Sequence, residues 1–260
     1  MRKKRKPAAE TKAAAKSKAA ASAAEKRRPA GNASLAVKRC FDVVSSGTAI
    51  LLLLPFWIGI SLAVKKDSEG PVLFRQERRT KDGRIFSMLK FRSMAVGAEH
   101  TGAGLFNYEN DPRVTKVGRR LRDTSLDELP QLFNILKGDM SVVGPRPCVA
   151  YELGDYDTLN QRYKKRFRMK AGLTGLAQVK GRNDLSWEEK VEYDNQYIDG
   201  FGRHGILIDL KILWISVWKA FRKEQVYEQK KESSLDDREA ARKAEAEIIR
   251  LAHLPEKEES

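Results

Sequence analysis

Two adjacent carboxylates, Asp127 and Glu128, are the side chains in this sequence with the clearest potential for chemistry. Neighbouring residues point about 100° apart on a helix, so the pair cannot form two facing acid groups. One carboxylate could instead attack phosphorus while the other holds a divalent cation such as Mg²⁺. Taken alone, the pair is explained more simply as favourable negative charge in the first turn of a helix.

Basic residues on both sides of this pair favour the chemical interpretation. The flanking groups are Arg113, Arg119, Arg120 and Arg122 upstream, and Gly144-Pro145-Arg146-Pro147 downstream. Guanidinium groups match phosphate oxygens geometrically, and Pro145 and Pro147 stiffen the backbone that carries Arg146. A simple rigid turn would have the same residues. The sequence contains neither GxxxxGKS/T nor GxGxxG, so a nucleotide would have to be held without those loops.

The elements expected to position the pair are a hairpin and a helix. Pro71 to Met94 holds two strand-like stretches around the Lys-Asp-Gly turn at 81–83, which predicts a β-hairpin. From Arg119 to Gly138 the apolar residues recur with helical spacing. Because Pro130 is disfavoured inside a helix, Asp127 and Glu128 are predicted in a first helical turn capped by Thr124 or Ser125.

An apolar run from Val43 to Val64 contains 22 residues without a charge, which is long enough to cross a bilayer. Lys38 and Arg39 precede it and further basic residues follow, so both ends favour the cytoplasmic side. Pro55 lies in the middle and predicts a break. A helix that enters the membrane, bends and returns is favoured over a single span, with Lys38 and Arg39 at anionic headgroups.

Two further segments have membrane-like features. Ile206 to Phe221 is mostly apolar, carries Trp214 and Trp218, and is too short to span. It is interpreted as an interfacial helix, although a buried core helix has the same pattern. Basic residues from Arg162 to Lys170 alternate with aromatic ones, which fits contact with anionic lipid or a solvated helix face.

The two ends of the chain differ from the middle in composition. Residues 1–39 carry thirteen Lys or Arg against two Glu, which accounts for +11 of the total +15. The predicted organisation is a basic disordered arm at 1–37, a re-entrant membrane helix at 38–66, a cytosolic catalytic domain with interfacial helices at 67–221, and a charged tail at 222–260. The fold class is α+β and mainly helical.

The chain resembles the monotopic phosphoglycosyl transferases, which initiate bacterial exopolysaccharide and related surface glycans. The resemblance rests on KRCFD at 38–42, LKFRSM at 89–94, the long run from Asp111 to Pro147, and AGLTGLAQVKGRN at 171–183. It implies a minimal catalytic form on the cytoplasmic face of the bacterial inner membrane. Leu54-Pro55 stands where some members have Ser-Pro, so the bend would depend on Pro55 and the flanking charges.

The resemblance also implies roles for individual residues. Asp127 would attack a UDP-sugar and form a covalent phosphosugar intermediate, which undecaprenyl phosphate then accepts. Glu128 and Asp127 would hold the cofactor Mg²⁺. The expected substrate-binding residues are Arg92, Arg113, Arg122, Pro145, Arg146 and Pro147. Membrane lipids are expected partners, a specific nucleic acid is not, and a homo-oligomer is left open, as is the identity of the sugar.

Two alternatives compete with this interpretation. A membrane-tethered adaptor could use the basic arm to bind nucleic acid or anionic lipid, but it would not explain why the arginines, Gly-Pro-Arg-Pro and Asp-Glu occur together. A polytopic lipid sugar-phosphate transferase would perform the same overall reaction by direct attack. That class needs many apolar segments, and this sequence has one long run.

Overall fold

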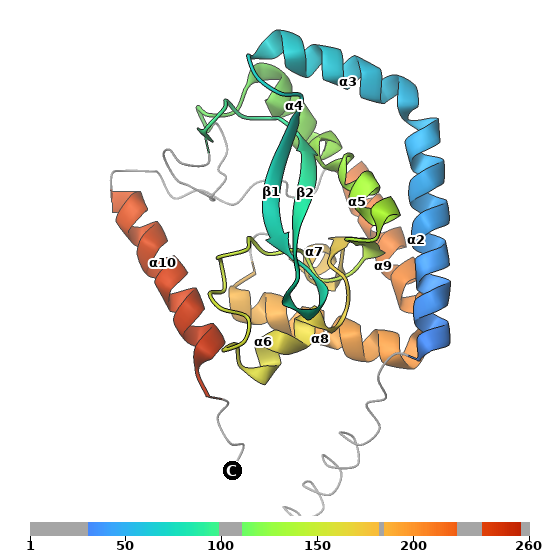
Figure 1. Ribbon diagram of the computed structural model, residues 1–260, viewed down its shortest axis with the longest axis vertical. Coiled ribbons are helices and arrows are strands. Elements are labelled where there is room, and N and C mark those ends of the chain that lie inside the picture. The colour runs from blue at the N-terminus through green and yellow to red at the C-terminus, as the bar shows by residue number, and fades with distance from the viewer. Residues whose placement is uncertain (1–30, 99–110, 182–184, 223–235, 256–260) are drawn as a thin grey trace, which may run out of the picture.

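The computed structural model describes residues 31–98, 111–181, 185–222 and 236–255. They form a mainly helical fold around a small β-hairpin, which confirms the predicted α+β class (Figure 1). The helices and strands are α2 (Asn32–Leu52), α3 (Leu54–Asp67), β1 (Leu73–Arg79), β2 (Ile85–Phe91), α4 (Lys116–Asp123), α5 (Gln131–Lys137), β3 (Ser141–Val143), α6 (Gln161–Lys165), β4 (Gly172–Thr174), α7 (Leu176–Lys180), α8 (Trp187–His204), α9 (Ile206–Phe221) and α10 (Asp236–His253).

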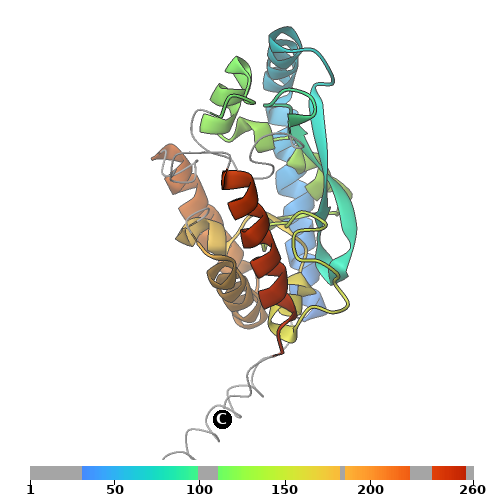
Figure 2. The same ribbon diagram turned by 90° about the vertical axis from the view of Figure 1, so that its left-hand side faces the viewer.

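The β-hairpin is confirmed at its predicted place. β1 and β2 pair in antiparallel register, with Leu73 opposite Phe91 and Arg79 opposite Ile85. In the turn between them Asp82 has φ 56°, a left-handed conformation that aspartate tolerates better than most side chains. Figure 2 shows the hairpin on one side of the molecule and the α8–α9 pair on the other. A second, parallel pair joins β3 to β4.

The apolar run folds as two helices with an angle of 65° between α2 and α3. Pro55 lies in the first turn of α3, where its missing amide hydrogen removes no helical hydrogen bond. The break predicted near Pro55 is therefore confirmed. The helix itself begins at Asn32, upstream of the predicted start at residue 38, and most of the predicted basic arm lies outside the described residues.

The surface of the bent pair is rich in exposed apolar side chains. Leu51, Leu52 and Phe56 are 73%, 72% and 64% exposed. Among the described residues no single helix is long and apolar enough to cross a membrane, whereas α2 and α3 together meet that criterion on length and composition. α2 also packs against α5 and α9 along its length (Figure 1). One side of the pair is thus integral to the fold.

The aromatic residues between Arg162 and Lys170 lie inside the protein. Tyr163 and Phe167 are buried in a cluster with Leu153 and Val191, and Met169 belongs to the main core. Arg166, 3% exposed, forms an ion pair of 2.9 Å with Asp194. The interpretation of this segment as a lipid-contacting surface is therefore wrong for its apolar residues. Tyr163 lies on α6, Phe167 in the 3-10 turn Arg166–Arg168 and Met169 directly after it, and all three are buried.

Helix α9 has the boundaries predicted from the sequence and two different faces. Asp209 and Ile212 are 0% and 1% exposed, whereas Trp214 and Leu207 are 72% and 67% exposed. A core face and an exposed apolar face therefore coexist on one helix; the core interpretation is confirmed for the first face, and contact of the second face with a membrane interface stays a prediction. The residues of the predicted charged tail that are described form α10, whose buried Ala252 packs on the Leu153 cluster.

Candidate active site

Asp127 and Glu128 lie in a tight 3-10 turn, Leu126–Glu128, between α4 and α5. The predicted helix over this region is therefore two short helices joined at the pair. Ser125 has φ 56°, and its side chain makes no capping hydrogen bond, while Thr124 Oγ1 donates to the Arg120 carbonyl at the end of α4. The predicted cap is wrong because the backbone turns left-handed at Ser125, and Pro130 then starts α5.

The Asp127 carboxylate is buried, with 8% of the residue exposed. Burial raises its pKa above the ordinary aspartate value, and the neighbouring Glu128 acts in the same direction. Lys90, Arg122 and Arg146 oppose that shift. A carboxylate removed from water and kept close to three cations is a better nucleophile toward an anionic phosphate than one on an open surface.

One carboxylate oxygen of Glu128 accepts hydrogen bonds from two basic side chains. Lys90 Nζ on β2 lies 3.1 Å from Glu128 Oε1, and Arg146 Nη2 lies 3.3 Å from the same atom. The Glu128 side chain is 13% exposed and that of Arg146 is 38% exposed. The cluster is therefore reachable from solvent on the arginine side, where an incoming phosphate could exchange places with the carboxylate as partner of Arg146.

Hydrogen bonds to the backbone carbonyls of its last three residues fix the Gly-Pro-Arg-Pro element. The Pro145 carbonyl accepts from Gly172 N at 2.9 Å, the Arg146 carbonyl from Arg166 Nη2 at 2.8 Å, and the Pro147 carbonyl from Arg78 Nη1 at 3.0 Å. A Cβ at Gly144 would lie 2.4 Å from the Lys170 carbonyl, so glycine is required there. The buried frame holds the backbone while the Arg146 side chain stays accessible.

The predicted arginines separate into two groups. Arg122 and Arg146 lie near Asp127, close enough to lower its pKa. Arg92 is 5% exposed and donates to the Ser68 carbonyl at 2.7 Å, at the end of α3. Arg113 pairs with Asp111 at 2.7 Å and donates to the Ala98 carbonyl. Arg92 and Arg113 are not among the charges that act on Asp127; Arg92 is directed to backbone oxygens at the end of α3, and Arg113 to Asp111 and Ala98.

Two basic residues at the site were missed in the sequence. Lys90 reaches Glu128 from β2, and Arg78 on β1 supports Pro147. Burial and the nearby positive charge of Arg146 lower the pKa of Arg78, which places the two guanidinium groups close to each other at the Gly-Pro-Arg-Pro element. Lys90 stands two positions before Arg92 in LKFRSM, and strand alternation puts both on one face. The alternation in the sequence identifies the face of β2 on which both residues lie, but it does not identify which of them reaches the site.

Lys38 and Arg39 were predicted at lipid headgroups; the structure instead buries Lys38, whereas Arg39 is partly exposed and its place at headgroups stays a prediction. Lys38 is 5% exposed; its Nζ donates to the Val143 carbonyl at 2.8 Å and forms an ion pair with Asp209. Arg39 donates to the carbonyls of Ile135 and Leu136, both at 2.7 Å, at the end of α5. Both side chains attach α2 to the core: Arg39 satisfies free carbonyls at the end of α5, and Lys38 bonds β3 and Asp209 of α9.

Asp127 and Glu128 provide part of the set of oxygen ligands that Mg²⁺ needs. Mg²⁺ is commonly bound through one or two carboxylates together with waters and substrate phosphates, so Asp127 and Glu128 supply the protein's usual share. In the described residues no group of three or more His, Cys, Asp or Glu side chains could hold a metal by itself. The residues therefore fit a cation that is completed by a bound diphosphate.

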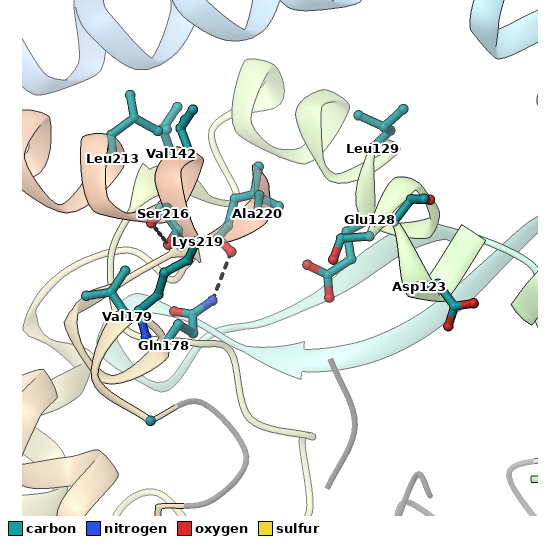
Figure 3. A pocket seen from close by; sticks show the side chains of 16 residues that line it. Asp123, Glu128, Leu129, Val142, Gln178, Val179, Leu213, Ser216, Lys219 and Ala220 are labelled. Carbon is teal, nitrogen blue, oxygen red and sulfur yellow. Dashed lines mark hydrogen bonds between the residues drawn. The ribbon is translucent and has the colours of Figure 1, made fainter. Parts of the chain in front are cut away.

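A cavity of about 580 Å³ opens beside Glu128. Figure 3 shows Glu128, Leu129 and Asp123 on one side of it, with α9 residues and Val179 on the other. Leu213, Val217 and Ala220 of α9 form one wall. The site thus combines a basic, solvent-facing side near Arg146 with a largely apolar hollow toward α9.

Comparison with known proteins finds a matching family and several similar proteins. The family model described as bacterial sugar transferase matches residues 33–223. A UDP-glucose:undecaprenyl-phosphate glucose-1-phosphate transferase from Klebsiella pneumoniae is 43% identical over 204 residues, covering 76% of this chain and 43% of that protein. A UDP-galactose-lipid carrier transferase from Erwinia amylovora is 37% identical, again over 76% of this chain and 43% of the relative.

A third relative is more similar in length. The exopolysaccharide production protein ExoY from Rhizobium meliloti is 40% identical, and the match covers 73% of this chain and 86% of that protein. The chain thus spans less than half the length of the Klebsiella and Erwinia relatives. A family model that covers residues 33–223 shows that the chain belongs to the bacterial sugar transferase family.

Proposed function

We propose that this protein is a phosphoglycosyl transferase that moves a sugar 1-phosphate from a UDP-sugar to undecaprenyl phosphate through a covalent Asp127 intermediate. The observation that carries the proposal is the buried Asp127 carboxylate beside a Glu128 that is ion-paired with Lys90 and Arg146. The names of the relatives supply the substrate classes. The membrane-tethered adaptor gives this arrangement no purpose.

The proposed reaction has two steps. In the first, an Asp127 carboxylate oxygen forms a bond to the β-phosphorus of the UDP-sugar, and the bond from that phosphorus to the bridging oxygen breaks, which releases UMP. In the second, an oxygen of the lipid phosphate attacks the same phosphorus and the bond to Asp127 breaks. The products are a lipid diphosphate sugar and the regenerated carboxylate. No oxidant or other reactant is needed.

The surrounding residues orient the phosphates and balance their charge. Arg146 and Lys90 now face Glu128, and both could turn to phosphate oxygens when the diphosphate binds. Arg122 acts on Asp127 from α4. Asp127 and Glu128 would hold Mg²⁺, which supplies positive charge that favours departure of UMP. Transition-state stabilisation by fixed cations typically contributes about 10²–10³ in rate for each donor.

The membrane position is part of the proposal. The bent pair α2–α3, with exposed Leu51, Leu52 and Phe56, would enter the cytoplasmic leaflet and return, so that the catalytic domain stays on the cytoplasmic face of the inner membrane. The exposed face of α9 would lie in the interface. Reporters fused at the N-terminus and at Lys66 should both be cytoplasmic, and opposite sides would refute the re-entrant path.

Intact-mass measurement tests the chemistry. The purified protein is incubated with Mg²⁺ and UDP-glucose or UDP-galactose in the absence of lipid acceptor, and a phosphosugar adduct with release of UMP is expected. Asp127→Asn should abolish the adduct, whereas Asp157→Asn, at an exposed aspartate away from the site, should not. If Asp127→Asn still transferred sugar phosphate to undecaprenyl phosphate, the lipid would attack directly and the covalent step would be wrong.

A further inference from the structure

We infer that the cavity between α9 and the carboxylate pair binds the part of the acceptor's prenyl chain that lies next to its phosphate. The inference rests on the proposed function and names where the lipid substrate is held. Glu128 lines one end of the cavity, and Leu213, Val217 and Ala220 of α9 line the other. A ligand in it would therefore have its head at the reaction centre and its tail against α9.

The chemistry of the walls selects an apolar ligand. Val142, Leu173 and Val179 line the cavity together with the leucine and valine side chains of α9. Three polar residues among them hydrogen-bond within the protein: the hydroxyls of Thr174 and Ser216 lie 2.6 Å apart and bond each other, Ser216 also donates to the Ile212 carbonyl, and the Gln178 amide nitrogen donates to the Leu173 carbonyl.

One polar atom among these residues, the side-chain oxygen of Gln178, has no hydrogen-bond partner, and it packs near the backbone of Gly175. Gln178 Oε1 is buried without a hydrogen bond, and a Cβ at Gly175 would come within 2.9 Å of it. A nucleobase would need several hydrogen-bonding groups aimed at its edge, because an unpaired polar edge is costly to bury. Apart from Lys219, the other polar lining residues, Asp123, Thr124, Ser125 and Glu128, belong to the end at the carboxylate pair. The wall formed by Val142, Leu173, Val179 and the apolar residues of α9 offers few such groups, so the nucleotide is better placed on the basic side near Arg146.

The position of α9 gives a hydrocarbon chain a way in. Val217, which lines the cavity, is 46% exposed, and the same helix exposes Trp214 and Trp218 at 72% and 52%. Exposed tryptophans on an apolar helix face suit a membrane interface. A chain leaving the bilayer along this helix would pass Val217 into the cavity without crossing water. With a volume of about 580 Å³ the cavity holds a segment of the lipid, and the remainder stays in the bilayer.

Substitutions in the cavity separate acceptor binding from the first step. Leu213→Gln puts an amide into the wall at similar size, and Ser216→Phe fills the space. Both should raise KM for undecaprenyl phosphate in phospholipid vesicles about tenfold, the effect expected when one leucine contact with an apolar chain is lost. UMP release and adduct formation from the UDP-sugar alone should stay unchanged, which also shows that the variants are folded.

Leu207→Gln is the matched control, because Leu207 is 67% exposed on α9 and does not line the cavity. If it raises the acceptor KM as much as Leu213→Gln, the effect comes from membrane association and the inference fails. An increased KM for the UDP-sugar in the cavity variants would instead make the cavity a nucleotide site. Unchanged acceptor KM in both would equally overturn the inference.

A photoreactive prenyl phosphate gives a readout that does not depend on turnover. Peptide mapping should find its label on α9 near Val217 and on the segment containing Leu173, with less label in Ser216→Phe. Label confined to α2 and α3 would contradict the assignment. Absence of UMP release by the unmodified protein would refute the covalent mechanism itself, whereas the labelling would still decide where the lipid binds.

Discussion

Two groups of basic residues in this protein look alike in the sequence and do different work in the structure. Lys90 and Arg146 meet at a Glu128 oxygen, and the Arg146 side chain is 38% exposed. Lys38 and Arg92 are buried at 5% exposed, and each donates to backbone carbonyls of elements distant in the chain. The first group can exchange its partner for a phosphate, and the second cannot do so without loosening the fold.

The difference shows what decides the role of a cation here. A buried cation whose partners are backbone carbonyls or a buried carboxylate is out of reach of a ligand, and it contributes to stability. A half-exposed cation beside a carboxylate keeps positive potential where a ligand can reach it. Accessibility and partner, more than residue type or spacing, therefore separate the proposed phosphate-handling residues from those that attach α2, α3 and the hairpin to one another.

Lys38→Met should give the largest effect on stability. It leaves Asp209, whose pKa burial already raises, without the cation that opposes that rise. Breaking a buried pair typically costs about 3–5 kcal/mol in the free energy of unfolding, which urea or thermal unfolding in detergent would measure. Because protonation removes the uncompensated charge, the loss should be smaller at acidic pH.

The double variant Lys38→Met/Asp209→Leu is the matched control for that effect. Replacing both charges with apolar groups should restore much of the lost stability, since neither partner is left unpaired. A single Lys38→Met variant with unchanged unfolding would show that Lys38 is not buried in solution. Its original assignment to lipid headgroups would then stand.

Among the basic residues of the two groups, Arg146→Ala should have the largest effect on activity, with little effect on stability. The side chain is 38% exposed and its ion pair with Glu128 measures 3.3 Å, so little folding energy depends on it. Loss of one fixed charge donor typically lowers the rate about 10²–10³-fold. Measured kcat/KM for UMP release should fall accordingly, while the unfolding midpoint stays within error. A large loss of stability would place Arg146 with the structural group.

Arg92→Met should behave in the opposite way. It removes the hydrogen bond to the Ser68 carbonyl at 2.7 Å, and the free energy of unfolding should fall by about 1–3 kcal/mol. The buried Nε and Nη1 atoms of Arg92 have no partner in the described structure, so their removal limits the loss. Activity per folded molecule should be retained. A fall in kcat/KM comparable with that of Arg146→Ala would return Arg92 to the substrate site.

The elements of the fold were predictable where a local rule sets them. The Lys-Asp-Gly turn marked the hairpin, Pro55 marked the break between α2 and α3, and the apolar run from Ile206 gave the start of α9. The left-handed turn at Ser125 was not predictable, because serine seldom adopts that conformation and its local pattern suggested a cap.

The site was predictable in part. Asp127, Glu128, Arg122 and Arg146 could be chosen because they cluster along the chain. Lys90 comes from a strand far away in the sequence, and its distance to Glu128 depends on how the hairpin packs on α5 and the 3-10 turn. Arg92 was chosen instead because the sequence does not show that the end of α3 would provide carbonyls for it.

Lys90→Gln should give the most specific effect, a shift in a pH profile. Among the nearby charges Lys90 is the strongest of those that lower the Asp127 pKa, against the larger effect of burial, which raises it. Removing that positive charge raises the Asp127 pKa further, so a higher pH is needed to ionise the nucleophile. The acid limb of the pH–rate profile for UMP release should therefore move to higher pH. Arg92→Met should leave the limb in place, because Arg92 is not among the charges that act on Asp127. An equal shift in both variants would show a general structural change and remove the distinction between the two groups.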